Sequence, residues 1–166
     1  MTFQPPVKVF LSYAHDDEEN GQLCSKIIKH LSPMGQLWDN LIDLWHDAHI
    51  RAGDNWRSER DRRMAESVLF VFLHSSSFTN SKECAVEYEH AEQRERDGVR
   101  LIMVRLRPAL EPEKIKNRQW TPRGSRPVSC FRDKDSIFKT VAADIMVEVR
   151  AIIAGGSSNS SQGTTS

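Results

Sequence analysis

Val68-Leu69-Phe70-Val71-Phe72-Leu73 is a strongly apolar run of β-branched and aromatic residues with two leucines. A run this short and this apolar predicts a β-strand that is buried on both faces. A polar turn follows it, and Ser81 is then a good N-cap for a helix. In that helix Cys84, Tyr88 and Ala91 recur at helical spacing and predict an inward face. The two segments together predict a buried strand leading into a helix, the repeating unit of an α/β fold.

Glu87 lies beside this inward face, three residues after Cys84 and four before Ala91. It is placed just beyond the C-terminal end of a buried strand, where α/β sheets bind ligands. Spacing alone leaves two interpretations open. The commoner one is a solvated glutamate on the helix surface, and the other is a carboxylate at the edge of a ligand cleft.

The alternation of strand and helix repeats along the chain. Besides residues 68–73, the sequence predicts strands at residues 7–13, 41–45 and 99–104, and a short edge strand at residues 127–128, with Trp120 in a loop. The predicted helices cover residues 23–31, 56–67 and 81–97, a short helix around residues 112–117, and a last helix capped by Asp133 or Asp135. The four acids at residues 16–19 are expected at a helix start, where the helix dipole offsets their repulsion. This order predicts a flavodoxin-like, doubly wound parallel sheet of about five strands with helices on both faces.

Length and composition suit one domain over residues 1–154, followed by a Gly/Ser-rich disordered tail or linker at residues 155–166. The formal net charge is zero, so no electrostatic feature favours direct binding to nucleic acid or to a membrane. The three cysteines are widely spaced, which favours a reducing, cytoplasmic location without disulfides. The arginines and acids of residues 57–66 predict a solvated helix face with i,i+4 ion pairs.

Several chemistries are disfavoured. The chain has no Gly-rich dinucleotide or P-loop motif and no nucleophile elbow. His46 and His49 flank Asp47 without a third ligand nearby, so no metal site is predicted, and the histidines are interpreted as loop and surface residues. A receiver-type phosphoacceptor domain shares the topology but needs a lysine after the strand at residues 99–104. Arg105 and Arg107 stand there instead.

Four segments, in order along the chain, resemble a Toll/interleukin-1 receptor (TIR) domain of the bacterial type. They are Val9-Phe10-Leu11-Ser12-Tyr13-Ala14-His15-Asp16-Asp17, Leu44-Trp45-His46-Asp47 with Ile50, Gly53 and Trp56, Phe70-Val71-Phe72-Leu73-His74-Ser75, and Phe78-Thr79-Asn80-Ser81-Lys82-Glu83-Cys84-Ala85-Val86-Glu87. The resemblance implies the same flavodoxin-like fold. It also makes residues 48–57 the loop that, in this family, covers the active cleft and makes assembly contacts.

The resemblance further implies that the chain cleaves NAD+ at the nicotinamide–ribose bond, with NAD+ as substrate and no metal. Many TIR domains do this with a glutamate three residues after the cysteine of this helix, which here is Glu87 after Cys84. A carboxylate there stabilises the oxocarbenium charge that builds on the ribose. The expected substrate-binding residues are Ser12, Tyr13, His15, Asp47, Gly53, Trp56, Ser75, Ser76 and Cys84.

One position departs from the family pattern. Many NAD-cleaving TIR domains place an aromatic residue directly before the cysteine, and this chain has Glu83. A carboxylate there is expected either to raise the pKa of Glu87 or to repel the pyrophosphate. Stacking on the substrate is then expected from Tyr13, Phe78 or a neighbouring subunit. The expected partners are further TIR domains, through homotypic self-association, and a fused or separate sensor module in anti-phage defence. The alternative function is a non-enzymatic TIR adaptor that only nucleates assemblies.

Overall fold

The computed structural model describes residues 5–19, 22–32, 40–46 and 55–155 of the 166-residue chain. Within this part, five strands form one parallel sheet in the order β2-β1-β3-β4-β5. The strands are β1 (Val7–Ser12), β2 (Ile42–Trp45), β3 (Leu69–His74), β4 (Arg100–Arg105) and β5 (Trp120–Thr121). The flavodoxin-like, doubly wound parallel sheet predicted from the sequence is therefore confirmed.

The strand order reverses at β1. The chain runs from β1 outward to β2 and then returns to place β3 on the other side of β1. Crossovers on the two sides of β1 leave the sheet on opposite faces, which opens a crevice at the carboxyl ends of these strands. Ser12, the last residue of β1, pairs with Phe72 of β3 at this edge.

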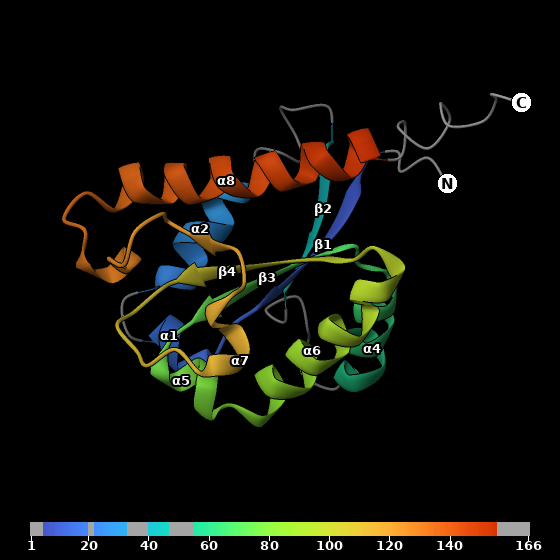
Figure 1. Ribbon diagram of the computed structural model, residues 1–166, viewed down its shortest axis with the longest axis horizontal. Helices are drawn as coiled ribbons and strands as arrows, with labels where there is room; N and C mark the ends of the chain where they lie inside the picture. Colours follow the sequence, from blue (N-terminus) through green and yellow to red (C-terminus); the bar gives the residue numbers. More distant parts are fainter. Residues whose placement is uncertain (1–4, 20–21, 33–39, 47–54, 156–166) are drawn as a thin grey trace, which may run out of the picture.

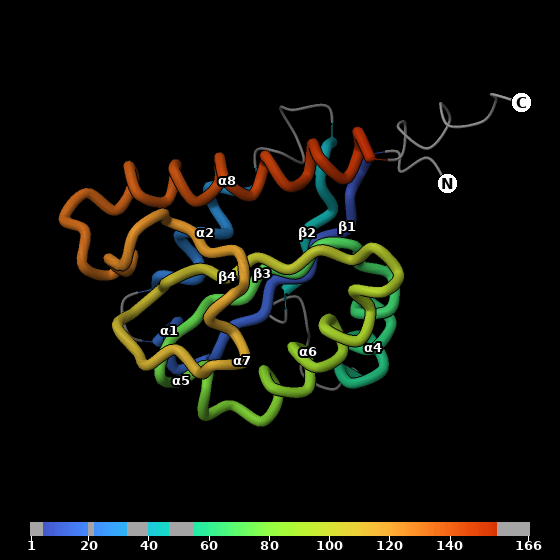
Figure 2. Tube along the Cα trace, in the orientation of Figure 1, coloured from blue at the N-terminus to red at the C-terminus, as the bar shows by residue number. Residues whose placement is uncertain are grey.

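Helices cover both faces of the sheet (Figure 1). On one face lie α2 (Leu23–Leu31) and the long α8 (Lys134–Gly155), which lies along the top of the molecule in Figure 2. On the other face lie α4 (Trp56–Glu66) and α6 (Lys82–Gln93). Shorter elements complete the fold: α1 (His15–Glu19), α5 (Ser76–Asn80), α7 (Glu113–Lys116) and the 3-10 helices η2 (Arg94–Asp97) and η3 (Val128–Cys130).

The apolar run that predicted a buried strand forms β3, at the centre of the sheet, and all six of its residues are buried. Alternate side chains point to opposite faces, so that Leu69, Val71 and Leu73 join the core beneath α2 and α8. Phe70 and Phe72 join the core beneath α4 and α6. Burying each of these side chains stabilises the fold by about 1.5–3 kcal/mol relative to leaving it exposed.

The fifth strand is not where the sequence placed it. Trp120–Thr121 forms β5 by pairing with Met103 and Val104 of β4, whereas Val128 lies in η3 and is fully buried there. The prediction of an edge strand at residues 127–128 was wrong. A strand of two residues shows no alternation, and only its partner strand identifies it.

The ends of the helices follow the sequence closely. Gly98 adopts a positive φ of 88° after η2, as expected for the residue that ends the α6 segment. Asp133 caps α8, because its carboxylate accepts hydrogen bonds from the backbone N–H and the hydroxyl of Ser136 at 3.0 and 2.6 Å. The α8 helix ends at Gly155, and residues 156–166 of the predicted tail lie outside the described part. None of the helices in the described ranges is both long enough and apolar enough to span a bilayer.

Candidate functional site

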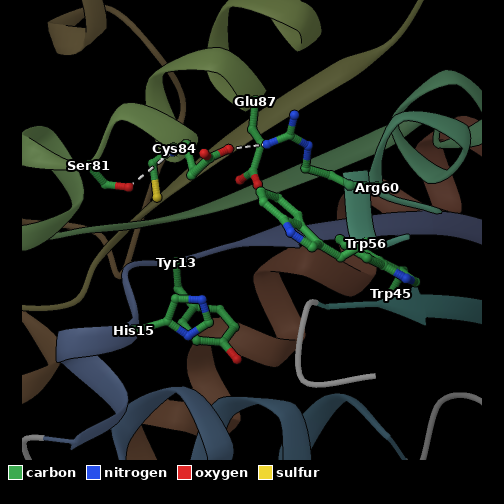
Figure 3. A pocket seen from close by; sticks show the side chains of 9 residues that line it. Tyr13, His15, Trp45, Trp56, Arg60, Ser81, Cys84 and Glu87 are labelled. Carbon is green, nitrogen blue, oxygen red and sulfur yellow. Dashed lines mark hydrogen bonds and ion pairs between the residues drawn. The ribbon is translucent and has the colours of Figure 1, made fainter. Parts of the chain in front are cut away.

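A cavity of about 430 Å³ opens at the carboxyl edge of the sheet, beside the end of β1 (Figure 3). The loop after β1, the end of β2 and the N-terminal halves of α4 and α6 supply its walls. The lining residues are Tyr13, His15, Trp45, Trp56, Arg60, Ser81, Glu83, Cys84 and Glu87. The cavity therefore lies at the topological switch point, where doubly wound sheets bind ligands.

Glu87 lies in the wall of this cleft and is only 7% exposed. Ser12, at the end of β1, is 1% exposed and donates a hydrogen bond from its hydroxyl to Glu87 Oε2 at 2.5 Å. The interpretation of Glu87 as a solvated surface residue is thus excluded. A buried carboxylate held by a buried hydroxyl has a defined position, as a group that acts on a bound ligand requires.

The start of α6 sets this geometry. The Ser81 hydroxyl accepts a hydrogen bond from the backbone N–H of Cys84 at 3.2 Å, and so caps the helix as predicted. With the helix start fixed, Cys84 and Tyr88 face the core and are 2% and 5% exposed. Glu87 lies one turn after Cys84, on the edge of this face that borders the cleft.

Aromatic side chains form much of the remaining surface of the cleft. Tyr13 and His15 lie at its lower side in Figure 3, with ring centroids 6.0 Å apart. Trp56 lies at the start of α4, and Trp45 stacks on Phe10 with centroids 4.7 Å apart. The structure therefore brings Tyr13, His15 and Trp56 to the cleft, as predicted. Trp45, which was not among the predicted site residues, both packs against Phe10 and lines the cleft.

Arg60 was predicted to lie on a solvated helix face, and this prediction was wrong. It is only 8% exposed, lines the cleft and forms an ion pair with Glu83 through Nη1. The prediction holds for the outer side of the same helix, where Arg62 bridges Glu59 and Glu66. The signal that would have located Arg60 is its i,i+4 spacing from Trp56 and Met64, which marks one face of α4.

The two predicted serines after β3 lie elsewhere. Ser75 caps α5, because its hydroxyl accepts a hydrogen bond from the Phe78 N–H at 3.0 Å and donates one to Asp17 Oδ2 at 2.5 Å. Ser76 is exposed on α5. Phe78, a predicted source of stacking, instead packs edge-on against Phe72, 6.0 Å away. These three residues are not among those that line the cavity, and neither is Ser12, which was also predicted to bind the substrate.

The acids at residues 16–19 lie in the short helix α1, as predicted, and Asp17 is the buried one among them. It is 1% exposed, and Arg107 contacts it twice: Nε donates to Oδ1 at 3.0 Å and Nη2 to the backbone oxygen at 3.3 Å. With Ser75, these contacts link α1, α5 and the segment after β4. Asp47 and Gly53, the remaining predicted site residues, lie outside the described residues.

Two histidines are buried, contrary to the expectation of loop and surface positions: His46 is 9% exposed and His74 is 1% exposed. Burial lowers the pKa of His74 below its ordinary value and Arg105 adds to this effect, against the opposing charges of Glu111 and Asp17. In the ranges that the structure describes, no three histidine, cysteine or acidic side chains are grouped so as to hold a metal ion.

Comparison with known proteins identifies the family to which this chain belongs. A family model described as TIR domain matches residues 9–135. A protein of Sinorhizobium fredii (strain NBRC 101917 / NGR234), named "Uncharacterized protein y4lF", is 26% identical over 137 residues, which cover 81% of this chain and 41% of that protein. The chain thus spans less than half the length of that relative.

A solved structure resembles the chain in fold. The TIR domain of the Toll-related receptor TRR-2 from Hydra magnipapillata matches with a TM-score of 0.57 over 86% of this chain and 97% of that one. At 14% identity this likeness shows the fold alone. The family model, in contrast, covers β1 from Val9 onward, the other four strands and every described residue that lines the cleft. The chain therefore belongs to the TIR domain family.

Proposed function

We propose that this TIR domain cleaves NAD+ at the bond between nicotinamide and ribose, with Glu87 as the catalytic carboxylate. The observation that carries the proposal is the burial of Glu87 in the wall of a 430 Å³ cleft, with the Ser12 hydroxyl 2.5 Å from its Oε2. A cavity of this size falls in the range that encloses cofactor-sized ligands. The enzyme is proposed to act in the cytoplasm, in immune or anti-phage signalling.

One carboxylate suffices for this reaction. The C–N bond breaks with its electron pair passing to the pyridinium ring, which leaves as neutral nicotinamide, so no general acid is needed. Positive charge develops on the ribose and is stabilised by the Glu87 carboxylate. Water then adds to the anomeric carbon and loses a proton to give ADP-ribose, or a nitrogen of the adenine adds instead to give a cyclic product.

The remaining walls suit the flat rings of a dinucleotide. Tyr13, Trp45 and Trp56 border the cleft, and aromatic faces bind heterocycles by stacking. Such residues compensate for the absence of an aromatic residue at position 83. The family's cleft loop corresponds to residues 48–57, of which the structure describes only 55–57.

The proposed test is release of nicotinamide from NAD+ by the purified chain, alone and clustered at high local concentration. Glu87→Gln is expected to lower the rate by at least about a hundredfold, as loss of one electrostatic catalytic group does. Glu89→Gln, a matched change at an exposed position on the same helix, is expected to keep the rate within about twofold. Equal release by the Glu87 variant, or none from the clustered wild type, would refute the assignment.

The alternative is a non-enzymatic adaptor that acts by homotypic self-association, with a fused or separate sensor module as a further partner. It is favoured by exposed apolar side chains that can serve in contacts between copies: Val86 is 47% exposed, Leu110 93% and Val147 62%. Oligomers that form with increasing concentration but never turn over NAD+ would support this alternative. Self-association together with turnover fits the enzyme, because TIR sites are often completed between subunits.

A further inference from the structure

We propose that Arg60 anchors the diphosphate of the dinucleotide, exchanging its ion pair with Glu83 for the phosphate oxygens of the substrate. This inference rests on the proposed function for the identity of the ligand. It assigns Arg60 and Glu83 opposite effects on affinity: Arg60 binds the substrate, and Glu83 competes with the substrate for Arg60.

Arg60 has the burial and the spare hydrogen-bonding capacity of a ligand-binding group. Its side chain is 10% exposed, and it reaches into the cleft from α4 as Glu87 does from α6 (Figure 3). Nη1 bonds Glu83, and Nη2 lies 3.4 Å from Asp61. Nε is buried and has no hydrogen-bond partner among the described residues. A buried donor without a partner is unfavourable, so a ligand oxygen that accepts from the guanidinium gains binding energy.

The partner of Arg60 is easily displaced. The Glu83 side chain is 52% exposed, whereas that of Arg60 is 10% exposed. Glu83 can therefore turn into water at little cost in desolvation, but Arg60 cannot do so without losing its packing. When a phosphate takes the place of the carboxylate, no buried charge is left unpaired, and the guanidinium fork matches phosphate geometry well.

Trp56 holds the guanidinium in place during such an exchange. The Arg60 guanidinium carbon lies 5.1 Å from the centroid of the Trp56 ring, within the range of a cation–π contact. The contact does not involve Glu83, so it persists when the ion pair opens. Arg60 is thus positioned before the ligand arrives, which reduces the entropy lost on binding.

The charges of the cleft require a cation for a dinucleotide to bind. Glu83 and Glu87 lie four residues apart on α6 and both line the cavity, so an incoming diphosphate meets two carboxylates. Arg60 is the one lysine or arginine among the described residues that line the cleft. Its removal leaves two acids facing a dianion, whereas neutralising Glu83 removes one source of repulsion and frees the guanidinium.

The experiment measures binding by isothermal titration calorimetry in the full chain carrying Glu87→Gln, which prevents turnover. The probes are NAD+ and nicotinamide riboside, which share the reacting end but differ in the diphosphate. Arg60→Gln is expected to raise the Kd for NAD+ about 10–100-fold and to leave that for the riboside within about twofold. Glu83→Gln is expected to lower the Kd for NAD+ about 3–10-fold.

Two further variants control for folding and for nonspecific charge. Arg57→Gln removes an exposed cation that lies 5.3 Å from the same Trp56 ring, and it is expected to change the Kd for NAD+ by less than about twofold. Arg60→Lys keeps the charge and is expected to recover part of the affinity that Arg60→Gln loses. Thermal unfolding of each variant shows whether the cleft is still folded.

A purely structural ion pair makes a different prediction: Arg60→Gln and Glu83→Gln would both weaken binding, and both ligands would be affected. The inference is overturned if both variants weaken the binding of both ligands in this way. It is also overturned if Arg60→Gln leaves the Kd for NAD+ unchanged, or if NAD+ does not bind at all. If NAD+ binds with the expected shifts and the chain with Glu87 intact releases no nicotinamide, the proposed function fails and the anchoring role stands. If nicotinamide is released with an unchanged KM in Arg60→Gln, the proposed function stands and the anchoring role fails.

Discussion

Removing the Ser12 hydroxyl tests whether the Glu87 carboxylate depends on it for its position. Both groups are buried, with Ser12 1% and Glu87 7% exposed, and their oxygens lie 2.5 Å apart. A hydrogen bond to a charged group contributes about 1.5–3 kcal/mol to the free energy of unfolding. The protein loses this whole contribution when the acceptor stays buried and its donor is removed. We therefore expect Ser12→Ala to lower the free energy of unfolding by about 1.5–3 kcal/mol.

The assay is urea unfolding at pH 7, followed by circular dichroism. For a domain of this size, each kcal/mol lowers Tm by about 2–4 °C, so a thermal scan should show a decrease of roughly 3–12 °C. Ser76→Ala is the matched control, because it deletes a serine hydroxyl at an exposed position of α5, and it is expected to stay within about 0.5 kcal/mol of wild type.

A double-mutant cycle then isolates the contact itself. Combining Ser12→Ala with Glu87→Gln should produce less than the sum of the two single losses, with a coupling energy of about 1 kcal/mol or more. If Ser12→Ala is as stable as Ser76→Ala, or if the two changes are additive, the hydroxyl does not hold the carboxylate. The same Ser12→Ala chain should then release nicotinamide at the wild-type rate.

Two further predictions concern buried ionisable side chains outside the cleft. Burial lowers the pKa of His74 in the folded chain, so the unfolded chain binds a proton at this histidine more readily than the folded chain does. The free energy of unfolding should therefore fall as the pH drops below about 6.5, by up to about 1.4 kcal/mol per pH unit. His74→Phe should flatten this dependence in urea unfolding between pH 5 and 7.5, and an unchanged slope would show that another group titrates. Arg107→Gln leaves the Asp17 carboxylate, with a side chain 2% exposed, without its cation and should lower stability by about 3 kcal/mol. Adding Asp17→Asn should restore much of that loss in the same assay, and a double variant as unstable as the single one would contradict the ion-pair explanation.

The fold could be predicted because local patterns and topology rules agree. The apolar run of β3 and the helical spacing after Ser81 each indicate one structure, and alternating strands and helices leave few topologies open. The exception, β5, has two residues and is defined only by its pairing with β4. No local signal distinguishes such a strand from a loop.

The site could be predicted where its residues follow a strand end or a helix repeat. Glu87, Cys84 and Tyr13 are of this kind, and all three line the cleft. Arg60 could not be found by charge pattern, because its sequence neighbours are exposed arginines and acids. Its burial follows from how α4 packs beside α6. Ser75 was misplaced because a hydroxyl after a strand can cap a helix as well as face a ligand, and the sequence does not distinguish the two uses.

The unequal division of aromatic residues between the two faces of the sheet has an optical consequence. Trp45 belongs to the core beneath α4 and α6, and Trp120 packs against that core. Trp56 lies at the start of α4. All three tryptophans in the described ranges therefore emit from the half of the molecule that contains the cleft. In a Trp38→Phe variant, which removes the tryptophan outside the described residues, intrinsic fluorescence should report on ligand entry into that half and should respond little to a loosening of α2 and α8. Comparing it with far-ultraviolet dichroism would separate events in the two halves without an added dye.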